Sequence, residues 1–290
     1  MRGGAGDIWL DSSCPICPNN PHCALIRIGN AGDGVGLSNA GFDGIPVKAG
    51  EKYDFSVFAR MLNVGDGRDN KPIGKLPLSV RLETKEGTVL GEAGVEASSP
   101  AEWKHLTATI TASQTVPDAR LVVLAKVPGL IALDEISLFP QKTFKGRRNG
   151  LRADLAQTIA DLHPKFMRFP GGCLTHGDGI GNIYRWKDTI GPIEQRKGQA
   201  NIWRYHQSVG LGYFEYFQFC EDIGARPLPV LAAGVSCQNS TRTRETGQQC
   251  VPFADMPAYI QDLLDLIEWA NGPTNSTWGA KRAAEGHPAP

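Results

Sequence analysis

The chain has 290 residues, which is long enough for two domains or for one large α/β domain. With 41% hydrophobic and 21% charged residues, its composition is that of a packed globular protein. Its 30 Lys and Arg balance its 30 Asp and Glu, so the charge argues against a protein that binds nucleic acid or an anionic membrane surface.

The part of the chain up to about residue 140 predicts a β-sandwich. Apolar and polar residues alternate there, which is the pattern of half-buried strands. Turn residues such as Glu86-Gly87 and Pro117-Asp118 separate these segments at short intervals. The expected strands are residues 53–60, 78–83, 103–110, 119–124 and 131–138.

The pattern changes at residues 140–148, where we expect a domain boundary. Beyond it, helical and strand-like segments alternate, which is the order of a parallel α/β layer. The first helix ends before His163-Pro164, because a proline disfavours helix in the residue before it. The expected helices are residues 151–162, 213–223 and 256–270, and the expected strands are residues 165–169 and 227–234.

The stretch FMRFPGGCLTHGDG, residues 166–179, is the main candidate site. It follows an expected strand, and ligands of parallel α/β folds bind at the carboxyl ends of the strands. Gly171 and Gly172 allow a sharp turn and a close approach of a ligand to the backbone, and Cys173 follows them. The alternative is a plain glycine turn without a ligand.

Two motifs that suggest a cofactor or a metal are weak. The run GDGIGN at residues 177–182 has no glycine at its sixth position and opens no helix, so we expect no dinucleotide cofactor. Cys14, Cys17, His22 and Cys23 carry side chains that bind zinc, but there is no second CxxC pair. A disulfide or an irregular loop is therefore favoured over zinc, and no metal site is predicted.

Several features bear on localisation. The first residues, MRGGAGDIWLDSS, lack the apolar segment of a signal peptide, and no apolar run approaches the roughly 20 residues that cross a bilayer. Cys237 and Cys250 flank a polar loop that a disulfide would close, which we expect if the protein is secreted. Asn239 and Asn275 begin Asn-Ser-Thr sequons and would then accept glycans.

Aromatic residues after the glycine turn suggest a sugar site, since sugars stack on aromatic rings. These residues are Tyr184, Trp186, Trp203 and Tyr205, and the alternative is that their rings pack beneath a long loop.

Retaining glycoside hydrolysis needs two carboxylates about 5–5.5 Å apart. None of the acidic residues here is a glutamate at a strand end, and His176 with Asp178 is interpreted as a pair of loop residues, not a catalytic pair. Asp134, in the last strand of the β half, is interpreted as a turn-facing residue rather than a calcium ligand. The carboxylates considered are Asp178, Asp188, Glu194, Glu215, Glu221 and Glu245.

Together these motifs carry a family resemblance. The matching runs are TFKGRRNGLRADLAQTIADLHPKFMRFPGGC (143–173), RWKDTIGPIEQR (185–196), GYFEYFQFCEDIGARPLPVLAAGVSCQ (212–238) and WANGPTNSTWGAKRAAEGHP (269–288). Over about residues 39–290 the chain closely resembles the α-L-arabinofuranosidases of glycoside hydrolase family 51. The run NAGFDGIPVKAGEKYDFSVFAR (39–60) is similar to the start of the carbohydrate-binding-module-like sandwich of fungal and related members.

The resemblance implies a jelly-roll β-sandwich followed by part of a (β/α)8 TIM barrel. We expect a divergent or irregular start at residues 1–38, the sandwich at 39–140 and the partial barrel at 141–290. The implied activity is hydrolysis of terminal non-reducing α-L-arabinofuranosyl residues from arabinan, arabinoxylan or arabinogalactan. It retains anomeric configuration through a covalent glycosyl–enzyme intermediate.

The resemblance also assigns residues. Cys173 matches the position after Pro-Gly-Gly, usually Asn or Cys, that contacts bound arabinose, and Gly171 and Gly172 shape that turn. The acid/base and nucleophile glutamates of the family are expected beyond Pro290, so no catalytic residue is assigned in this chain. Family members often have a Glu near the position of Thr175 or His176, and this chain does not.

The expected partners are arabinose-containing polysaccharides or oligosaccharides. The resemblance also implies secretion and allows an oligomer. Two alternatives to an arabinofuranosidase stay open, a non-catalytic carbohydrate-binding fragment and a gene fragment without function.

Overall fold

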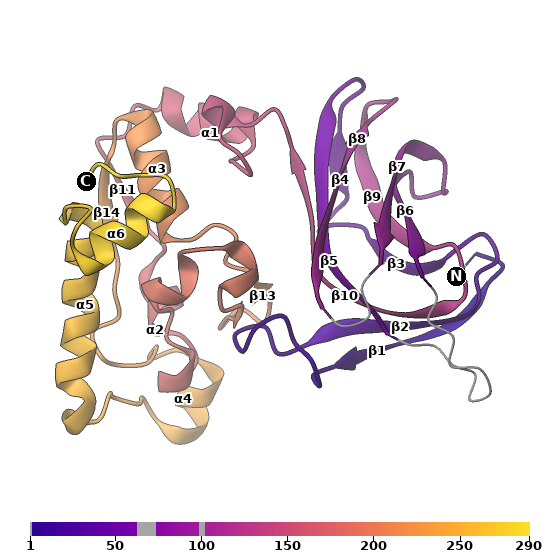
Figure 1. The fold of residues 1–290 in the computed structure, drawn as a ribbon. Helices are drawn as coiled ribbons and strands as arrows, with labels where there is room; N and C mark the ends of the chain where they lie inside the picture. Colours follow the sequence, from indigo (N-terminus) through magenta and orange to yellow (C-terminus); the bar gives the residue numbers. More distant parts are fainter. Residues whose placement is uncertain (1, 63–73, 99–101) are drawn as a thin grey trace. The chain divides into compact units, whose positions relative to one another are not determined.

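A computed structural model describes residues 2–62, 74–98 and 102–290 of the chain. The chain divides into two compact units, Met1–Gln157 and Thr158–Pro290 (Figure 1). Within the described residues, no helix is both long and apolar enough to cross a membrane.

The first unit is a β-sandwich of two antiparallel sheets (Figure 1). One sheet has the strand order β1-β2-β10-β5-β8, and its strands are β1 (Ala5–Asp11), β2 (Cys23–Asn30), β10 (Gly129–Pro140), β5 (Lys52–Leu62) and β8 (Lys104–Thr111). The other has the order β3-β9-β6-β7, with β4 also paired to β9, and its strands are β3 (Val35–Asn39), β9 (Val116–Ala125), β6 (Leu76–Glu83), β7 (Val89–Ala97) and β4 (Ile45–Val47). The five strands expected from alternation are confirmed as β5, β6, β8, β9 and β10.

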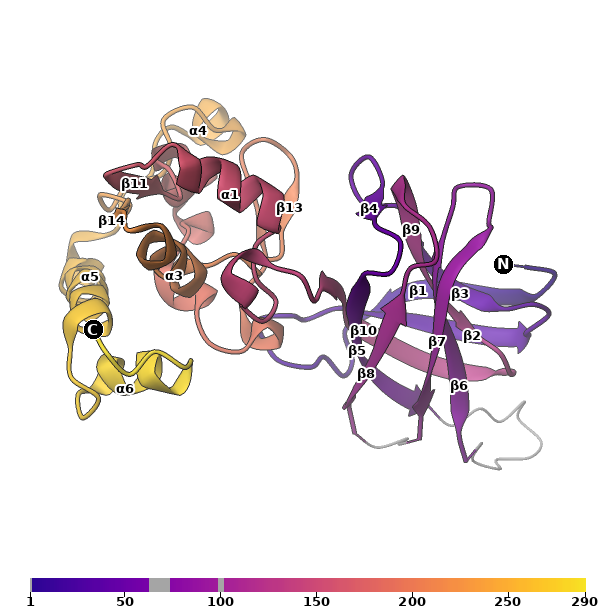
Figure 2. The same ribbon diagram turned by 90° about the horizontal axis from the view of Figure 1, so that it is seen from above.

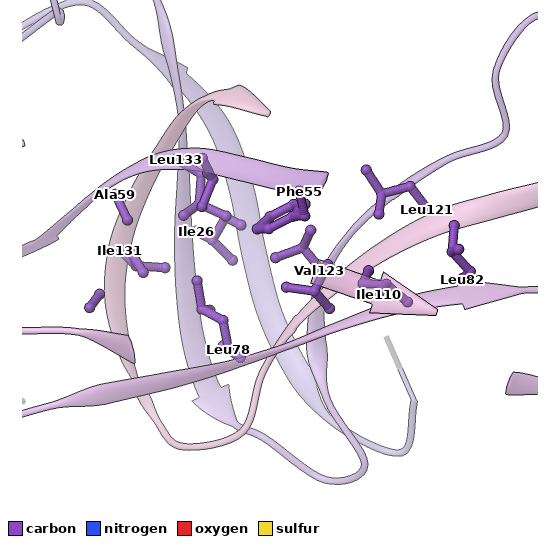
Figure 3. Packing of buried hydrophobic residues seen from close by; sticks show 14 of the residues in the cluster. Ile26, Phe55, Ala59, Leu78, Leu82, Ile110, Leu121, Val123, Ile131 and Leu133 are labelled. Atoms are coloured by element: carbon purple, nitrogen blue, oxygen red, sulfur yellow. The ribbon is translucent and has the colours of Figure 1, made fainter. Parts of the chain in front are cut away.

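The core of the sandwich lies between the two sheets (Figure 3). In β5 the side chains of Phe55, Val57 and Ala59 are buried, whereas Lys52 and Asp54 are exposed. Burying one such apolar side chain contributes roughly 1.5–3 kcal/mol, so the alternation fixes which face of each strand turns inward. Other buried members of this core are Ile26, Leu78, Leu82, Ile110, Leu121, Val123, Ile131 and Leu133.

The structure corrects the expected irregular start at residues 1–38. Strands β1 and β2 lie within this segment, and β2 is hydrogen-bonded to β1 on one side and to β10 on the other. Ile26 and Ile28 are buried in the sandwich core. Strand β2 joins the sheet through β10, whose residues lie about a hundred positions later in the chain. Since β1 pairs with β2 in turn, the sandwich begins near Ala5 rather than at residue 39.

The end of the sandwich unit also differs from the expected boundary at residue 140. The backbone N–H of Gln141 donates to the carbonyl of Lys52 over 2.9 Å, and Thr143 forms an antiparallel bridge with Arg152. The short helix η1 (Phe144–Gly146) lies within this segment. These contacts attach residues 141–157 to the first unit.

The second unit begins within α1 (Ala153–Asp161) and is built around the parallel strands β11 (Phe166–Phe169) and β14 (Arg226–Pro229). Helix α3 (Tyr213–Ile223) connects toward β14 and packs on both strands (Figure 2). The described residues contain this open strand pair and no closed barrel. The remaining elements are α2 (Gly172–His176), η2 (Ile180–Asn182), η3 (Trp186–Thr189), η4 (Ile193–Gln195), β12 (Gln199–Ala200), β13 (His206–Gln207), α4 (Thr241–Thr246), η5 (Phe253–Asp255), α5 (Met256–Asn271) and α6 (Thr277–Ala284).

The predicted helix–strand order is confirmed, but β14 ends at Pro229 instead of residue 234. Beyond Pro229, tyrosine side chains from two helices donate hydrogen bonds to the main-chain carbonyl groups, and no neighbouring strand pairs with this segment among the described residues. The Tyr213 hydroxyl donates to the carbonyl of Val230 over 2.8 Å, and the Tyr259 hydroxyl donates to that of Ala232 over 2.6 Å. Helix α3 ends as predicted, with Gly224 in the left-handed conformation at φ 69°.

Candidate functional site

The candidate site is the turn that follows β11. The Phe169–Pro170 peptide bond is cis, and Gly171 has φ 132°, a conformation that residues with a side chain rarely adopt. Gly172 then opens the one-turn helix α2, in which Thr175 is buried and donates its hydroxyl to the carbonyl of Gly172 over 2.9 Å. Because Leu174 and Thr175 face inward, Cys173 is left exposed to solvent.

The carboxyl ends of β11 and β14 are adjacent, as the sequence predicts. Phe169 is paired with Pro229, and the backbone N–H of Val230 donates to the carbonyl of Phe169 over 2.6 Å. The loops that follow the two strands therefore start side by side, which is where parallel α/β folds bind ligands.

Hydrogen bonds join these two loops further along. The backbone N–H of Cys237 donates to the carbonyl of Gly177 over 3.2 Å. Asp178 accepts the backbone N–H of Arg242 over 2.9 Å, and the Gln249 side chain accepts that of Ile180 over 2.9 Å. Asp178 therefore holds the second loop against the first.

His176, the other loop residue of the motif, is half-buried at the end of α2. Its Nδ1 atom is buried and has no hydrogen-bond partner among the described residues. No carboxylate is hydrogen-bonded to this imidazole there, so His176 and Asp178 do not form the hydrogen-bonded pair of an acid–base catalyst.

The predicted disulfide between Cys237 and Cys250 is not formed. All seven cysteines lie within the described residues, and all are free thiols. Cys250 is exposed and bridges to Val235 only through its backbone, whereas the Cys237 side chain is fully buried. The influence of the Cys237 thiol, followed by burial, raises the pKa of the Cys173 thiol.

The four aromatic residues of the following loop fall into two groups. Tyr184 and Trp186 are buried in the core of the second unit, so they follow the packing alternative. Trp203 and Tyr205 are 53% and 46% exposed, with ring centroids 6.4 Å apart and planes at 20°. Asn201 accepts the backbone N–H of Trp203 over 3.0 Å and fixes this turn between β12 and β13.

This hairpin is attached to the candidate site through Asn182. Its side-chain oxygen accepts the backbone N–H of Asp178 over 2.9 Å, and its amide group donates to the carbonyl of Ala200 over 3.0 Å. The exposed rings therefore belong to a hairpin that is hydrogen-bonded, through Asn182, to the loop after β11.

The carboxylates considered from the sequence have structural partners or lie away from the strand ends. Glu215 forms a two-pronged ion pair with the buried Arg196, with both distances 2.9 Å, and Glu221 contacts His287 at 2.7 Å. Both glutamates belong to α3. The half-buried Asp188 lies in η3, and burial raises the pKa of its carboxyl group. Glu194 lies in η4 and Glu245 in α4.

The cysteines near the start lie in the loop after β1 and at the first residue of β2. Cys14 accepts a hydrogen bond from the Arg60 guanidinium, and its carbonyl accepts the indole N–H of Trp103 over 3.1 Å. Cys23 is buried with Leu25 and Ala132. The described residues contain no cluster of three side chains that could hold a metal ion.

The remaining predicted positions lie on the surface or beside the sheet. Asn239 and Asn275 are both exposed, which leaves their glycosylation a prediction. Asp134 is half-buried in β10, where one carboxylate oxygen accepts the backbone N–H of Glu135 over 2.8 Å.

A groove of about 280 Å³ lies elsewhere in the second unit. It is lined by Phe217, Trp269 and His287, and by Ala225 and Pro227 at the amino end of β14. Because ligands of parallel strands bind at the carboxyl ends, this groove is not the candidate site.

Comparison with known proteins agrees with these elements. Residues 158–290 match the family model described as the alpha-L-arabinofuranosidase 1 domain. The chain is 44% identical over 273 residues to an extracellular exo-alpha-L-arabinofuranosidase of Streptomyces chartreusis, covering 89% of this chain and 30% of that protein. It is 37% identical over 261 residues to alpha-L-arabinofuranosidase 1 of Arabidopsis thaliana, covering 89% of this chain and 35% of that protein.

A solved structure agrees in fold as well. An arabinose-bound GH51 α-L-arabinofuranosidase superposes with a TM-score of 0.85 at 30% identity, covering 98% of this chain and 44% of its own. The chain thus spans about a third of the length of the two curated relatives. The sandwich, the parallel strand pair and the sequence matches agree, and the chain is similar to part of the α-L-arabinofuranosidases of glycoside hydrolase family 51.

Proposed function

We propose that this chain supplies the arabinofuranose-binding turn of an α-L-arabinofuranosidase. That enzyme would remove terminal non-reducing α-L-arabinofuranosyl residues from arabinan, arabinoxylan or arabinogalactan and retain the anomeric configuration. The observation that carries the proposal is the exposed Cys173 at the joined carboxyl ends of β11 and β14, within the segment that the family model matches.

The glycines of the turn leave room for a sugar. Apart from Gly171 and its two chain neighbours, no described residue has an atom within 4 Å of the position that a Cβ on Gly171 would occupy. A Cβ on Gly172 would meet only the guanidinium of Arg168, at 3.5 Å. A ligand can therefore approach this backbone closely, and the thiol of Cys173 offers a weak hydrogen-bonding group beside it.

We further propose that Trp203 and Tyr205 bind an oligosaccharide rather than a single sugar. Their stacked, half-exposed rings form an apolar surface on a hairpin that Asn182 ties to the same loop. Aromatic faces of this kind stack on pyranose and furanose rings. The rings would hold the saccharide units that follow the terminal arabinofuranose.

The described residues support binding more than catalysis. Retaining hydrolysis needs two carboxylates about 5–5.5 Å apart, one of them as nucleophile. Glu215 and Glu221 lie in α3 and are engaged with Arg196 and His287. We therefore assign no catalytic residue among them.

The test measures sugar binding and hydrolysis by the 290-residue chain. Saturation-transfer NMR with L-arabinose and an arabino-oligosaccharide should show binding, and Cys173→Ala should weaken it. Cys250→Ala, at an exposed cysteine of the neighbouring loop, is the matched control. Equal binding by both variants would contradict the proposed turn, and release of nitrophenol from 4-nitrophenyl α-L-arabinofuranoside would contradict the absence of a catalytic pair.

A carbohydrate-binding role of the sandwich is a second candidate. Phe58 and His105 stack on adjacent strands with ring centroids 4.6 Å apart and planes at 21°, and His105 is exposed. Retention of the chain on insoluble arabinoxylan should fall in the Phe58→Ala variant. Retention that is unchanged by this substitution would remove the support for this role.

Secretion is part of the same proposal. One relative is named as extracellular, and both sequon asparagines, Asn239 and Asn275, are exposed in this chain. Expression in a eukaryotic secretory system should add glycans at these positions, read as a mass decrease after treatment with an amidase that removes N-glycans.

A further inference from the structure

The first unit contains a groove that is lined by more cations than carboxylates. Two cavities of about 310 and 410 Å³ share Lys48 and Lys142 in their lining, and we call them together the lysine groove. Ligand sites in proteins measure roughly 300–1,000 Å³, and each cavity reaches that size. The lining cations are Lys48, Lys142, Lys145 and Arg152, and the lining carboxylates are Glu51 and Asp154.

The groove forms beside the start of β5 and the segment after β10. The backbone N–H of Gln141 donates to the carbonyl of Lys52 over 2.9 Å, and Thr143 forms an antiparallel bridge with Arg152. Main-chain contacts therefore hold the walls of the groove in place.

Both carboxylates of the lining have cationic partners. The Arg152 guanidinium donates to the two carboxylate oxygens of Asp154 over 2.8 and 2.9 Å. A carboxylate oxygen of Glu51 lies 3.7 Å from the Nζ atom of Lys142. These two pairs leave the other two lysines of the groove unneutralised.

The two remaining cations are Lys48 and Lys145. Both are exposed, and no carboxylate of the described residues forms an ion pair with either. Lys145 has φ 54°, a left-handed conformation that is unfavourable for a residue with a side chain and that is found most often at functional sites. Because charges of one sign in a cleft attract ligands of the opposite sign, these amines favour an anionic ligand.

Part of the groove is apolar. Ile45 and Leu138 pack against the sandwich core, and Pro46 and Pro140 line the same cavity. Such a surface stabilises a ligand by removing its apolar atoms from water. The groove therefore suits a ligand that has both an anionic group and an apolar face, as a sugar ring with a carboxylate has.

A nucleic acid, the other common polyanion, does not fit these residues. Tyr53 and Phe144, the aromatic residues of the lining, are only 5% and 6% exposed, so neither ring is open for stacking with a base.

We propose that the lysine groove binds acidic oligosaccharides through their uronate groups. Lys48 and Lys145 contact the uronate carboxylates, and the apolar surface of Ile45 and Leu138 packs against the sugar ring. The groove belongs to the first unit and the Cys173 turn to the second, so this inference goes beyond the proposed function and does not depend on it.

The experiment titrates the full chain with tri-galacturonic acid at neutral pH and low salt, and measures binding by calorimetry. Lys48→Gln and Lys145→Gln should each weaken binding about threefold, and the double variant about tenfold, as expected for exposed ion pairs that act independently. Lys165→Gln removes an equal charge at an exposed lysine of the second unit and should leave binding unchanged. Added sodium chloride should weaken binding to the unaltered chain.

The Glu51→Gln variant should have the opposite effect, which a loss of folding cannot imitate. It removes the carboxylate beside Lys142 and should tighten binding about threefold, because a negative charge leaves the groove. Weaker binding by Glu51→Gln would contradict the electrostatic role of the groove.

Other outcomes would also overturn the proposal. They are no binding by the unaltered chain, equal binding of neutral xylotriose, and a double lysine variant that binds as the unaltered chain does. Displacement of the galacturonide by an equal concentration of inorganic phosphate, or tighter binding of an oligonucleotide of equal charge, would show a site for anions in general. Cys173→Ala should bind tri-galacturonic acid unchanged, so failure of the sugar-binding turn and failure of the lysine groove are distinguishable.

Discussion

The carboxylate of Asp178 accepts the backbone N–H of Arg242 over 2.9 Å, so a residue of the turn after β11 binds the first turn of α4 in the loop after β14. This contact satisfies an N–H group that has no partner within the helix, and the negative charge lies at the positive end of the helix. The two loops of the candidate site therefore depend on each other.

The Asp178→Ala variant should loosen α4. The loss of a helix-capping carboxylate costs about 1 kcal/mol, which makes local opening about fivefold more frequent. Limited trypsin digestion should then cleave after Arg242 or Arg244 correspondingly faster. The control is Glu245→Ala in the same helix, an exposed residue, and equal cleavage of the two variants would contradict the role of Asp178.

A side chain at Gly171 should destabilise the protein, whereas a side chain at Gly172 should be tolerated. The φ of 132° at Gly171 strains any residue with a Cβ, so Gly171→Ala should lower the free energy of unfolding by about 1–3 kcal/mol. Gly172 begins α2 with ordinary φ, and Gly172→Ala should change it by less than about 0.5 kcal/mol. Thermal denaturation followed by circular dichroism measures both, and two equal melting temperatures would show that the turn relaxes.

Glu83 should be the most sensitive charge of the sandwich unit. Its side chain is fully buried and lies among three guanidinium groups, with Arg2 in contact, Arg120 at 3.6 Å and Arg81 at 3.9 Å. Glu83→Ala leaves these cations without their partner and should cost about 3–5 kcal/mol in urea denaturation.

The matched control for Glu83 is Lys75→Ala, which removes an exposed ion pair with Glu96. Solvent screens such a pair, so the midpoint of denaturation should not change measurably. If Glu83→Ala and Lys75→Ala had similar effects, the arginine cluster would not stabilise the sandwich.

Asp134 should make stability depend on pH. Burial raises the pKa of its carboxyl group above the usual range of an aspartate. The folded chain therefore binds this proton more tightly than the unfolded chain, and this residue's contribution to stability falls as pH rises between the two pKa values. As pH rises through that interval, the free energy of unfolding of Asp134→Asn should increase relative to that of the unaltered protein. Above the interval the difference between the two proteins should stay constant.

Urea denaturation across the acid range measures this difference for Asp134→Asn. The exposed Asp43→Asn variant serves as the control, because it removes no buried charge, and its curve should run parallel to that of the unaltered protein. A constant difference for Asp134→Asn throughout the range would show that burial does not affect this carboxyl group.

Local patterns in the sequence were enough to predict much of both units. Alternation predicts five of the sandwich strands, because inward and outward side chains of a strand lie two residues apart. The end of α3 follows from Gly224, which adopts the left-handed conformation without a steric penalty. The position of the Pro-Gly-Gly turn follows from the apolar strand before it.

Long-range pairing decided the features that the sequence left open or predicted wrongly. Strand β2 belongs to the sandwich because it pairs with β10, and nothing near residues 23–30 in the sequence indicates that partner. Trp186 and Trp203 have similar surroundings in the sequence, yet one is buried in the core and the other is half-exposed.

The same distinction explains the cysteines. From the sequence, Cys250 is the natural partner of Cys237, because only a short polar loop separates them. In the folded chain the backbone of Cys237 is hydrogen-bonded to Gly177 in the loop after β11, and Cys250 stays exposed. The sequence by itself determined the strands, the helices and the glycine turn, since these depend on neighbouring residues. Which loop and which rings lie at the site was decided only by the tertiary structure, because those contacts join segments that are far apart along the chain.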